Sequence, residues 1–312
     1  MSESIVKVEN LSHRYNIQWA VRDINFEIRK EGVYGLLGAN GAGKSTIMNI
    51  MCGVLRQSHG NVYIDGINMS ENSVEAKKRI GFLPQQAPLH PDLTVEEYLR
   101  HAAAMRLVPD PVIPKTVDTA MEKCRVTHFR KRLIRNLSGG YQQRVGIAQA
   151  IVHNPKFIVL DEPTNGLDPN QILEVRKLIK EIAEEHMVLL STHILQEVQA
   201  TCDHIWMINE GVQVFSGTIN EFDNYIIPNS LIVSLMDPPV IDELQEIYGV
   251  EGVEDIGDKS FRVRFKDADE AIDGIVHKSI EKEWRLREIR IEKTSMDSVF
   301  AELSKTKNLK RL

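Results

Sequence analysis

The stretch Gly38-Ala39-Asn40-Gly41-Ala42-Gly43-Lys44-Ser45-Thr46 decides how the rest of this chain is interpreted. It follows an apolar run, 33–37, and opens a segment with helical periodicity. Its three glycines let successive backbone N–H groups turn inward around an anion, because no Cβ stands in the way. The pattern therefore predicts a phosphate-binding loop between a strand and a helix.

The polar side chains of this loop have predicted contacts of their own. Lys44 reaches the β- and γ-phosphates of a nucleotide, and Ser45 offers its hydroxyl to Mg²⁺. The helix that follows points the positive end of its dipole at the phosphates and should bury one face, formed by residues 47, 48, 50, 51 and 54. A glycine-rich surface turn is the alternative, and the flanking strand and helix disfavour it.

Composition and charge narrow the class of protein. The chain has 312 residues, of which 42% are hydrophobic and 26% are charged, as in soluble globular proteins of two domains. Its net charge is −6, so no overall positive potential attracts nucleic acid to the chain. Nucleic acid is therefore not an expected partner. No signal peptide or membrane span is expected, and Cys52, Cys124 and Cys202 lack metal-ligand spacing. We therefore expect a cytosolic chain with reduced, buried cysteines.

Strands are predicted before the loop, at 5–8 and, with alternating apolar residues, at 24–28. After the loop, Asp65-Gly66 has the composition of a two-residue hairpin turn. Tyr15 is expected in the polar connection between the first two strands. An exposed ring near a nucleotide site can stack on adenine. A tyrosine packed between strands is the equally weighted alternative.

Residues 86–150 are predicted to form a helical insert. Gln85, just before it, leaves a short strand and can turn its amide toward a metal or a water. Thr94 and Glu97 have the spacing of a capping box. Ser138, Gly139 and Gly140 stand at a later helix start, where backbone N–H groups can bind a second anion. An ordinary capped helix is the alternative there.

A continuous apolar run, 157–160, ends in Asp161 and Glu162, as a buried parallel strand does when its C-terminal end opens on an active crevice. Asp161 is expected to hold Mg²⁺. Glu162 is expected to accept a proton from, or to orient, the water that attacks the γ-phosphate. His193 ends the next apolar run, where it can donate to a phosphoryl oxygen, although most lone histidines are structural.

These motifs, in this order, resemble those of the nucleotide-binding subunits of ABC transporters. The stretch LSGGYQQR at 137–144 is similar to the signature motif of that family, and 38–45 to its Walker A motif. The resemblance covers about residues 1–220 and implies an ATPase that uses ATP and Mg²⁺. It also implies a dimer, formed with a second copy or with a homologous ATPase subunit, in which each ATP lies between the Walker A motif of one subunit and the signature of the other.

The resemblance assigns a role to each candidate residue. The residues with expected catalytic roles are Lys44, Gln85, Glu162 and His193. The expected Mg²⁺ ligands are Ser45, Gln85 and Asp161. Nucleotide contacts fall to Tyr15, Gly38, Asn40, Gly41, Ala42, Gly43, Lys44, Ser45, Thr46, Ser138, Gly139, Gly140 and Asp168.

The predicted fold is an α/β P-loop NTPase of ABC type at 1–222, with an antiparallel β subdomain and the helical insert. A small ferredoxin-like accessory domain is predicted at 229–304, from its order strand-helix-strand-strand-helix-strand, and a basic tail at 305–312. Residues 294–300 look similar to the end of the ATPase subunits in the drug- and sodium-exporter branch, where the permease is a separate membrane chain.

The expected function is therefore ATP hydrolysis that powers a membrane permease, an exporter, from the inner face of the cell membrane. A permease-independent ABC ATPase that acts on a soluble macromolecular partner is the alternative, disfavoured by the single copy and the absence of sustained heptads. A module that binds ATP without hydrolysing it is disfavoured by the presence of Glu162 and His193.

We expect Lys44→Ala to abolish tight ATP binding or hydrolysis, because it removes the positive charge placed on the β- and γ-phosphates. Steady-state phosphate release by the purified chain measures this effect. Turnover at the wild-type rate in this variant would rule out the assignment of the phosphate loop.

Overall fold

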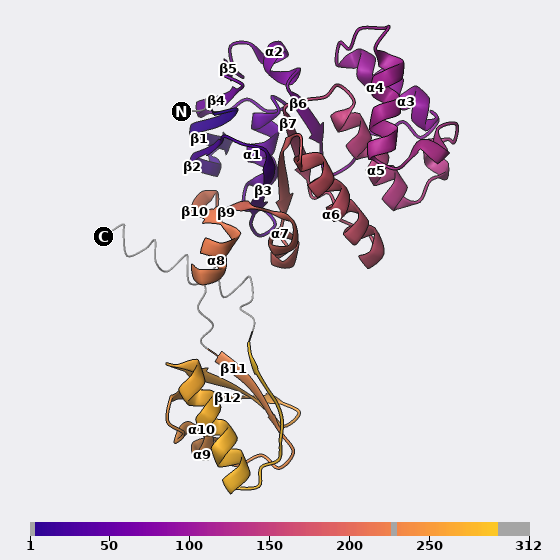
Figure 1. Ribbon diagram of the computed structural model, residues 1–312. Coiled ribbons are helices and arrows are strands. Elements are labelled where there is room, and N and C mark those ends of the chain that lie inside the picture. The colour runs from indigo at the N-terminus through magenta and orange to yellow at the C-terminus, as the bar shows by residue number, and fades with distance from the viewer. Residues whose placement is uncertain (1–3, 226–229, 293–312) are drawn as a thin grey trace. The chain divides into compact units, whose positions relative to one another are not determined.

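The computed structural model describes residues 4–225 and 230–292 (Figure 1). These residues form two compact units that divide between Phe222 and Asp223. The assignment of 1–222 and 229–304 as functional domains stays a prediction. The proposed basic tail, 305–312, and the exporter-like segment, 294–300, lie outside the described residues.

The first unit is built on a six-stranded sheet in the order β10-β9-β3-β8-β7-β6. Its strands are β3 (Gly32–Leu37), β6 (Ile80–Leu83), β7 (Phe157–Asp161), β8 (Met187–Thr192), β9 (His204–Asn209) and β10 (Val212–Thr218). All run parallel except β10, which pairs antiparallel with β9 at one edge. Strands β7 and β8 are buried along their whole length, as expected for parallel strands covered on both faces.

A second, antiparallel sheet has the order β2-β1-β4-β5. Its strands are β1 (Val6–Tyr15), β2 (Gln18–Ile28), β4 (His59–Ile64) and β5 (Ile67–Asn68). Asp65 and Gly66 have φ angles of 52° and 75° and form the predicted two-residue hairpin turn. The placement of Tyr15 in a polar connection is wrong, because β1 continues to Tyr15 and pairs it with Gln18.

Helix α1 (Lys44–Met51) shares one hydrophobic core with the antiparallel sheet and with alternate residues of the central strands. Ile47, Met48, Ile50 and Met51 are buried there as predicted. The prediction that Val54 is buried on the same face is wrong. It is 66% exposed, because the helix ends at Met51 and Gly53 turns the chain with a φ of 65°.

Three helices pack against strands of the central sheet: α5 (Gly139–Ile151), α6 (Pro169–Ala183) and α7 (Leu195–Thr201). The first unit also contains α2 (Ser73–Lys77), and α8 (Ile219–Tyr225) follows β10. The three cysteines are buried and free, which confirms the prediction made for them. None of the helices in the described part of the chain is long and apolar enough to span a bilayer.

The helical insert consists of α3 (Val95–Met105), α4 (Ile113–Lys123), two short 3-10 turns (Thr127–Phe129 and Ile134–Asn136) and α5. Its predicted capping box is present. The Thr94 hydroxyl accepts the Glu97 N–H, and the Glu97 carboxylate accepts the Thr94 N–H at 2.8 Å. This cap fixes where α3 begins, directly after the loop that starts at Gln85.

The second unit contains β11 (Ser230–Leu235), α9 (Ile241–Gln245), β12 (Val250–Gly257), β13 (Ser260–Phe265), α10 (Ala268–Glu281) and β14 (Leu286–Ile291). Its sheet has the order β12-β13-β11-β14, with every pair antiparallel. This is the predicted ferredoxin-like arrangement of a split βαβ fold. The unit has a core of its own, which includes Val233, Phe261, Ile275 and Trp284.

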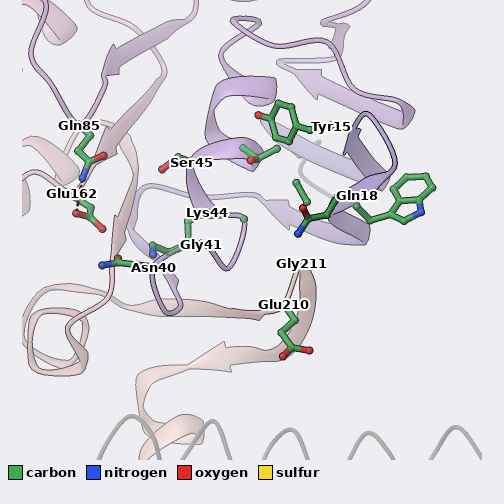
Figure 2. Close-up of a pocket in the computed structure, with 14 residues that line it drawn as sticks. Tyr15, Gln18, Asn40, Gly41, Lys44, Ser45, Gln85, Glu162, Glu210 and Gly211 are labelled. Carbon is green, nitrogen blue, oxygen red and sulfur yellow. Dashed lines mark hydrogen bonds between the residues drawn. The ribbon is translucent and has the colours of Figure 1, made fainter.

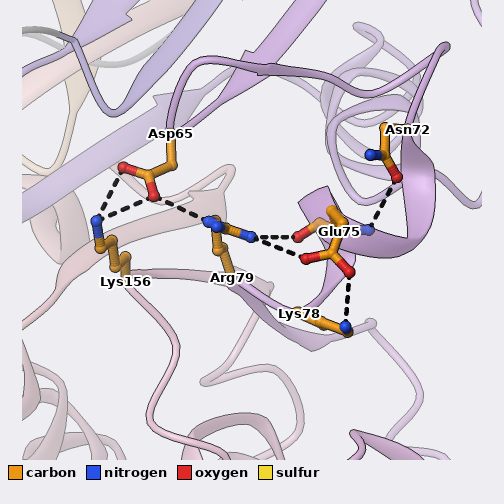
Figure 3. Close-up of polar contacts among 6 residues, drawn as sticks. All are labelled: Asp65, Asn72, Glu75, Lys78, Arg79 and Lys156. Atoms are coloured by element: carbon orange, nitrogen blue, oxygen red, sulfur yellow. Dashed lines mark hydrogen bonds and ion pairs between the residues drawn. The ribbon is translucent and has the colours of Figure 1, made fainter.

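An ion-pair cluster joins the antiparallel sheet to the central sheet (Figure 3). The Asp65 carboxylate, in the β4–β5 turn, accepts hydrogen bonds from Lys156 Nζ at 2.9 and 3.0 Å and from Arg79 Nε at 2.8 Å. Lys156 directly precedes β7. The hydrogen bond from Lys156, together with Arg79, holds the pKa of Asp65 below its usual value, against the opposing effect of burial.

We expect Asp65→Asn to lower the free energy of unfolding by about 1 kcal/mol at neutral pH, because it removes the charge from hydrogen bonds joining two sheets. A depressed folded-state pKa stabilises the fold above the pKa of the unfolded chain, about 3.9, and this contribution disappears as the pH falls through the folded-state pKa. The difference from wild type should therefore shrink in acid. Urea unfolding at neutral pH and near pH 3.5 measures it.

Asp92→Asn is the matched control. Asp92 pairs with Arg135 at 2.6 Å, but its side chain is 83% exposed, so solvent screens this pair. Equal stability losses in the two variants at neutral pH would contradict the structural role given to Asp65.

Candidate functional site

A cavity of about 740 Å³ opens above the phosphate loop (Figure 2). It is lined by Tyr15, Gln18, Trp19, Ala20, Asn40, Gly41, Gly43, Lys44, Ser45, Thr46, Gln85, Glu162, Glu210 and Gly211. The structure thus brings the predicted stacking residue, most of the loop, Gln85 and Glu162 to one site. The contributions of β2 and of the β9–β10 turn were not predicted, since neither segment carries a motif.

The glycines of the loop are required by its shape. Gly41 and Gly43 have φ angles of 81° and 107°, a left-handed region that other residues rarely adopt. A Cβ on Gly43 would lie 2.6 Å from Val21 Cγ1 on β2. The Ala42 carbonyl accepts the Gly211 N–H at 3.0 Å. Gly38 and Ala42 are buried residues of the loop and do not line the cavity. Their predicted nucleotide contacts could therefore come only from the backbone.

Lys44 is 5% exposed, and its ammonium group donates to the carbonyls of Gly38 at 2.8 Å and Ala39 at 3.1 Å. Burial lowers the pKa of Lys44, while the negative charges of Glu162 and Asp161 act in the opposite direction. Its hydrogen bonds are to neutral oxygens, so a phosphate would supply an ionic partner.

Two carboxylates stand at the end of β7. The Ser191 hydroxyl, on the neighbouring strand β8, donates to the Asp161 carboxylate and accepts the Glu162 N–H at 3.0 Å. Glu162 has a φ of 48°, which turns the chain sharply where the strand ends. Ser191 thereby links the Asp161 carboxylate to the backbone of Glu162, whose side chain lines the cavity.

Gln85 and His193 converge on the Glu162 carboxylate. Gln85 Nε2 donates to one oxygen at 3.1 Å, and His193 Nδ1 lies 3.2 Å from the other. Figure 2 shows the Gln85 and Glu162 side chains pointing toward each other. Three residues that lie far apart in the sequence, each at the end of a parallel strand, therefore meet at one carboxylate.

The signature residues lie apart from this cavity. Ser138 is the N-cap of α5, and its hydroxyl makes no capping hydrogen bond, so the alternative of an ordinary side-chain cap is not supported. Ser138 and Gly139 are exposed. Asp168 caps α6 by accepting the N–H groups of Asn170 and Gln171, each at 3.0 Å. Within the described chain, neither Asp168 nor residues 138–140 line the nucleotide cavity.

The residues predicted to hold Mg²⁺ fit that ion chemically. Ser45, Gln85 and Asp161 supply hydroxyl, amide and carboxylate oxygens, the ligands that Mg²⁺ prefers. Ser45 and Gln85 line the cavity, and Asp161 ends the adjacent strand. The described residues contain no cluster of three His, Cys, Asp or Glu side chains placed to bind a metal by itself. Phosphate oxygens of a nucleotide would complete such a site.

Comparison with known proteins agrees with this geometry. Residues 21–165 match the family model described as ABC transporter. The bacitracin transport ATP-binding protein BcrA of Bacillus licheniformis is 35% identical over 210 residues, which cover 67% of this chain and 68% of BcrA. The uncharacterized ABC transporter ATP-binding protein YhcH of Bacillus subtilis is 28% identical over 309 residues, which cover 97% of this chain and 96% of YhcH.

Solved structures show the same fold in the first unit. CbiO1 of Clostridium perfringens, part of the ABC transporter complex CbiONQ, has a TM-score of 0.66 and 30% identity over 71% of this chain and 91% of its own. The ATP-binding cassette MJ0796, as a dimer in a post-hydrolysis state with ADP and Pi, has a TM-score of 0.62 and 27% identity over 69% of this chain and 98% of its own.

The chain belongs to the ABC transporter family, as an ATP-binding subunit. It is an ATPase that binds ATP and uses Mg²⁺, and its first unit has the α/β P-loop fold predicted from the sequence.

Tyr15 lines the cavity and is 51% exposed. Its ring packs in a T-shaped pair with the His13 ring, and the two ring centroids are 4.7 Å apart. We expect Tyr15→Ala to weaken ATP and ADP binding by about fivefold, since stacking contributes roughly 1 kcal/mol, and to leave kcat nearly unchanged. Calorimetric titration and steady-state kinetics separate the two effects. Wild-type affinity for both nucleotides would exclude a stacking role for Tyr15.

Proposed function

We propose that this chain hydrolyses ATP to power a separately encoded membrane permease, through closure of two ATPase subunits around ATP. The observation that carries this proposal is the meeting of Gln85, Glu162 and His193 beside the cavity that holds Lys44. A site that only bound ATP would need the loop, but it would need no carboxylate held by two polar side chains at the γ-phosphate end.

Each residue has a proposed part in hydrolysis. Lys44 binds the β- and γ-phosphates, and its charge counters the negative charge that develops as the terminal phosphate leaves. Glu162 orients the attacking water and takes up its proton, while Gln85 and His193 hold the carboxylate in place. Mg²⁺, bound by Ser45, Asp161 and Gln85, would neutralise phosphate charge.

The catalytic site is proposed to be shared between two subunits. Ser138 has a free capping hydroxyl at the exposed start of α5, and the cavity of the same chain does not include it. A helix start of this kind attracts anions through its unpaired N–H groups and its dipole. The γ-phosphate of ATP bound to a second subunit would be its ligand, with Asp168 beside the same interface. MJ0796 forms a dimer with ADP and Pi.

Export is the proposed direction of transport. BcrA is named for bacitracin transport, and SrtF of Streptococcus pyogenes, 35% identical over 208 residues, is named for lantibiotic transport. We propose that the chain lies on the cytoplasmic face of the cell membrane, bound to its permease. The ATP-binding domain spans 1–222, and 229–304 is an accessory domain. The alignment with YhcH, which covers 97% of this chain, supports a shared two-domain organisation.

Glu162→Gln tests both hydrolysis and the shared site. This near-isosteric change should reduce turnover at least a hundredfold, because the amide cannot take up a proton from water. ATP should remain bound and hold two subunits together, so the variant should elute as a dimer with ATP and as a monomer without it. Phosphate release and size-exclusion chromatography measure the two effects.

The control adds Ser138→Arg to Glu162→Gln, which places a bulky side chain at the proposed interface and leaves the cavity of each chain intact. This double variant should bind ATP and stay monomeric. An ATP-bound Glu162→Gln protein that stayed monomeric at high concentration would refute the shared site, and rapid turnover in that variant would refute the proposed role of Glu162.

A further inference from the structure

Glu197, on α7, is a buried carboxylate outside the nucleotide cavity. The residue is 6% exposed. One carboxylate oxygen accepts the Thr164 hydroxyl at 2.6 Å, and the other accepts the Thr192 hydroxyl at 2.8 Å. The guanidinium group of Arg176, on α6, lies 3.7 Å from the first oxygen. The carboxylate therefore joins three segments of the chain to α7.

Two of these segments carry the residues that meet in the catalytic site. Thr192 is the last residue of β8 and directly precedes His193. Its hydroxyl also accepts the Ile194 N–H at 3.1 Å, so it fixes the backbone on both sides of the histidine. Thr164 follows Glu162 by two residues. Glu197 thus connects the chain next to His193 with the chain next to Glu162.

The same turn is tied to the signature helix. Gln143, on α5, donates from Nε2 to the Pro163 carbonyl at 2.8 Å. Pro163 lies between Glu162 and Thr164 in the sequence. The turn that leaves the catalytic strand is therefore held from one side by α5 and from the other by Glu197.

The energetics favour a positioning role over a packing role. A buried charge is costly unless its hydrogen bonds are complete, and an apolar side chain of similar size would pack there more cheaply, as the neighbouring Val198 does. Hydrogen bonds to a carboxylate are short and directional. Because its donors lie on separate segments, displacement of either threonine would leave the charge incompletely paired. Glu197 thereby restricts relative movement of these segments.

We propose that Glu197 is a positioning residue for ATP hydrolysis: it holds the chain beside His193 and the chain beside Glu162 in fixed register, so that their 3.2 Å contact is preserved. This inference rests on the proposed function, in which Glu162 orients the attacking water and His193 holds the Glu162 carboxylate in place. Glu197 is not among the residues that line the nucleotide cavity, and it acts through Thr192 and Thr164.

Glu197→Gln in the full chain is the first test. The amide oxygen can accept one threonine hydroxyl, but the NH₂ group can only donate to the other, so that hydrogen bond must reverse its direction. The neutral amide also removes the negative charge that faces Arg176. We expect kcat to fall about tenfold or more, since small displacements of catalytic groups have effects of this size. The Kd for ATP should stay within about twofold, because neither Glu197 nor the two threonines that it contacts line the nucleotide cavity. Unchanged kcat, or a loss of ATP affinity equal to the loss of kcat, would overturn the proposal.

Thr201→Val is the matched control. Thr201 is buried on the same helix, and its hydroxyl has no hydrogen-bond partner within the described chain. The change removes a buried hydroxyl from α7 without touching the Glu197 network. Wild-type kcat in this control supports the proposal, and a loss as large as that of Glu197→Gln overturns it.

A double-mutant cycle distinguishes positioning from general damage. Thr164→Val combined with Thr192→Val removes both donors and also the acceptor of the Ile194 N–H, so it should lower kcat at least as much as Glu197→Gln does, at unchanged ATP affinity. Adding Glu197→Gln to this pair should then have no further effect, because the three side chains act as one unit. A triple variant whose kcat is lower than that of the threonine pair by the full factor lost in Glu197→Gln would overturn the proposal. If Glu197→Gln does not fold, the threonine pair gives the same test by its own kcat and Kd.

Glu162→Gln separates this inference from the function on which it rests. Rapid hydrolysis by Glu162→Gln would overturn both. An inactive Glu162→Gln together with a fully active Glu197→Gln would overturn the role of Glu197 alone.

Discussion

The burial of one ammonium group shapes the first unit. Lys44 is enclosed by the loop whose carbonyls it contacts, and these neutral oxygens do not balance its charge. Gly43 of this loop passes close to β2, and the Gly211 N–H donates to the Ala42 carbonyl. The two sheets therefore meet at the loop. The Asp65 ion-pair cluster is a second connection between the same two sheets.

Parallel pairing explains why distant residues converge. Strands β6, β7 and β8 lie side by side and run in the same direction, so the residues that follow them emerge at one edge of the sheet. Gln85, Glu162 and His193 occupy these positions. The contacts behind them, from Ser191 and Glu197, come from side chains one strand or one helix away.

The sequence predicted the features whose chemistry is local. The capping box of Thr94 and the turn at Asp65 are each encoded by a few consecutive residues, and both are present. Trp19 and Glu210 were missed because they enter the cavity through strand pairing and turn packing, which leave no motif. Val54 was misplaced because a left-handed glycine ended the helix before the apolar pattern did.

Glu162 has a left-handed backbone conformation, with a φ of 48°. A residue other than glycine, asparagine or aspartate held in this region carries strain on the order of 1 kcal/mol. The chain thus bears a local conformational cost at the residue proposed to orient water, and the Ser191 hydrogen bond to its N–H helps to maintain it. Glycine at this position would relieve the strain and remove the carboxylate together. Selection for thermal stability alone would therefore favour a more robust protein that no longer turns over ATP.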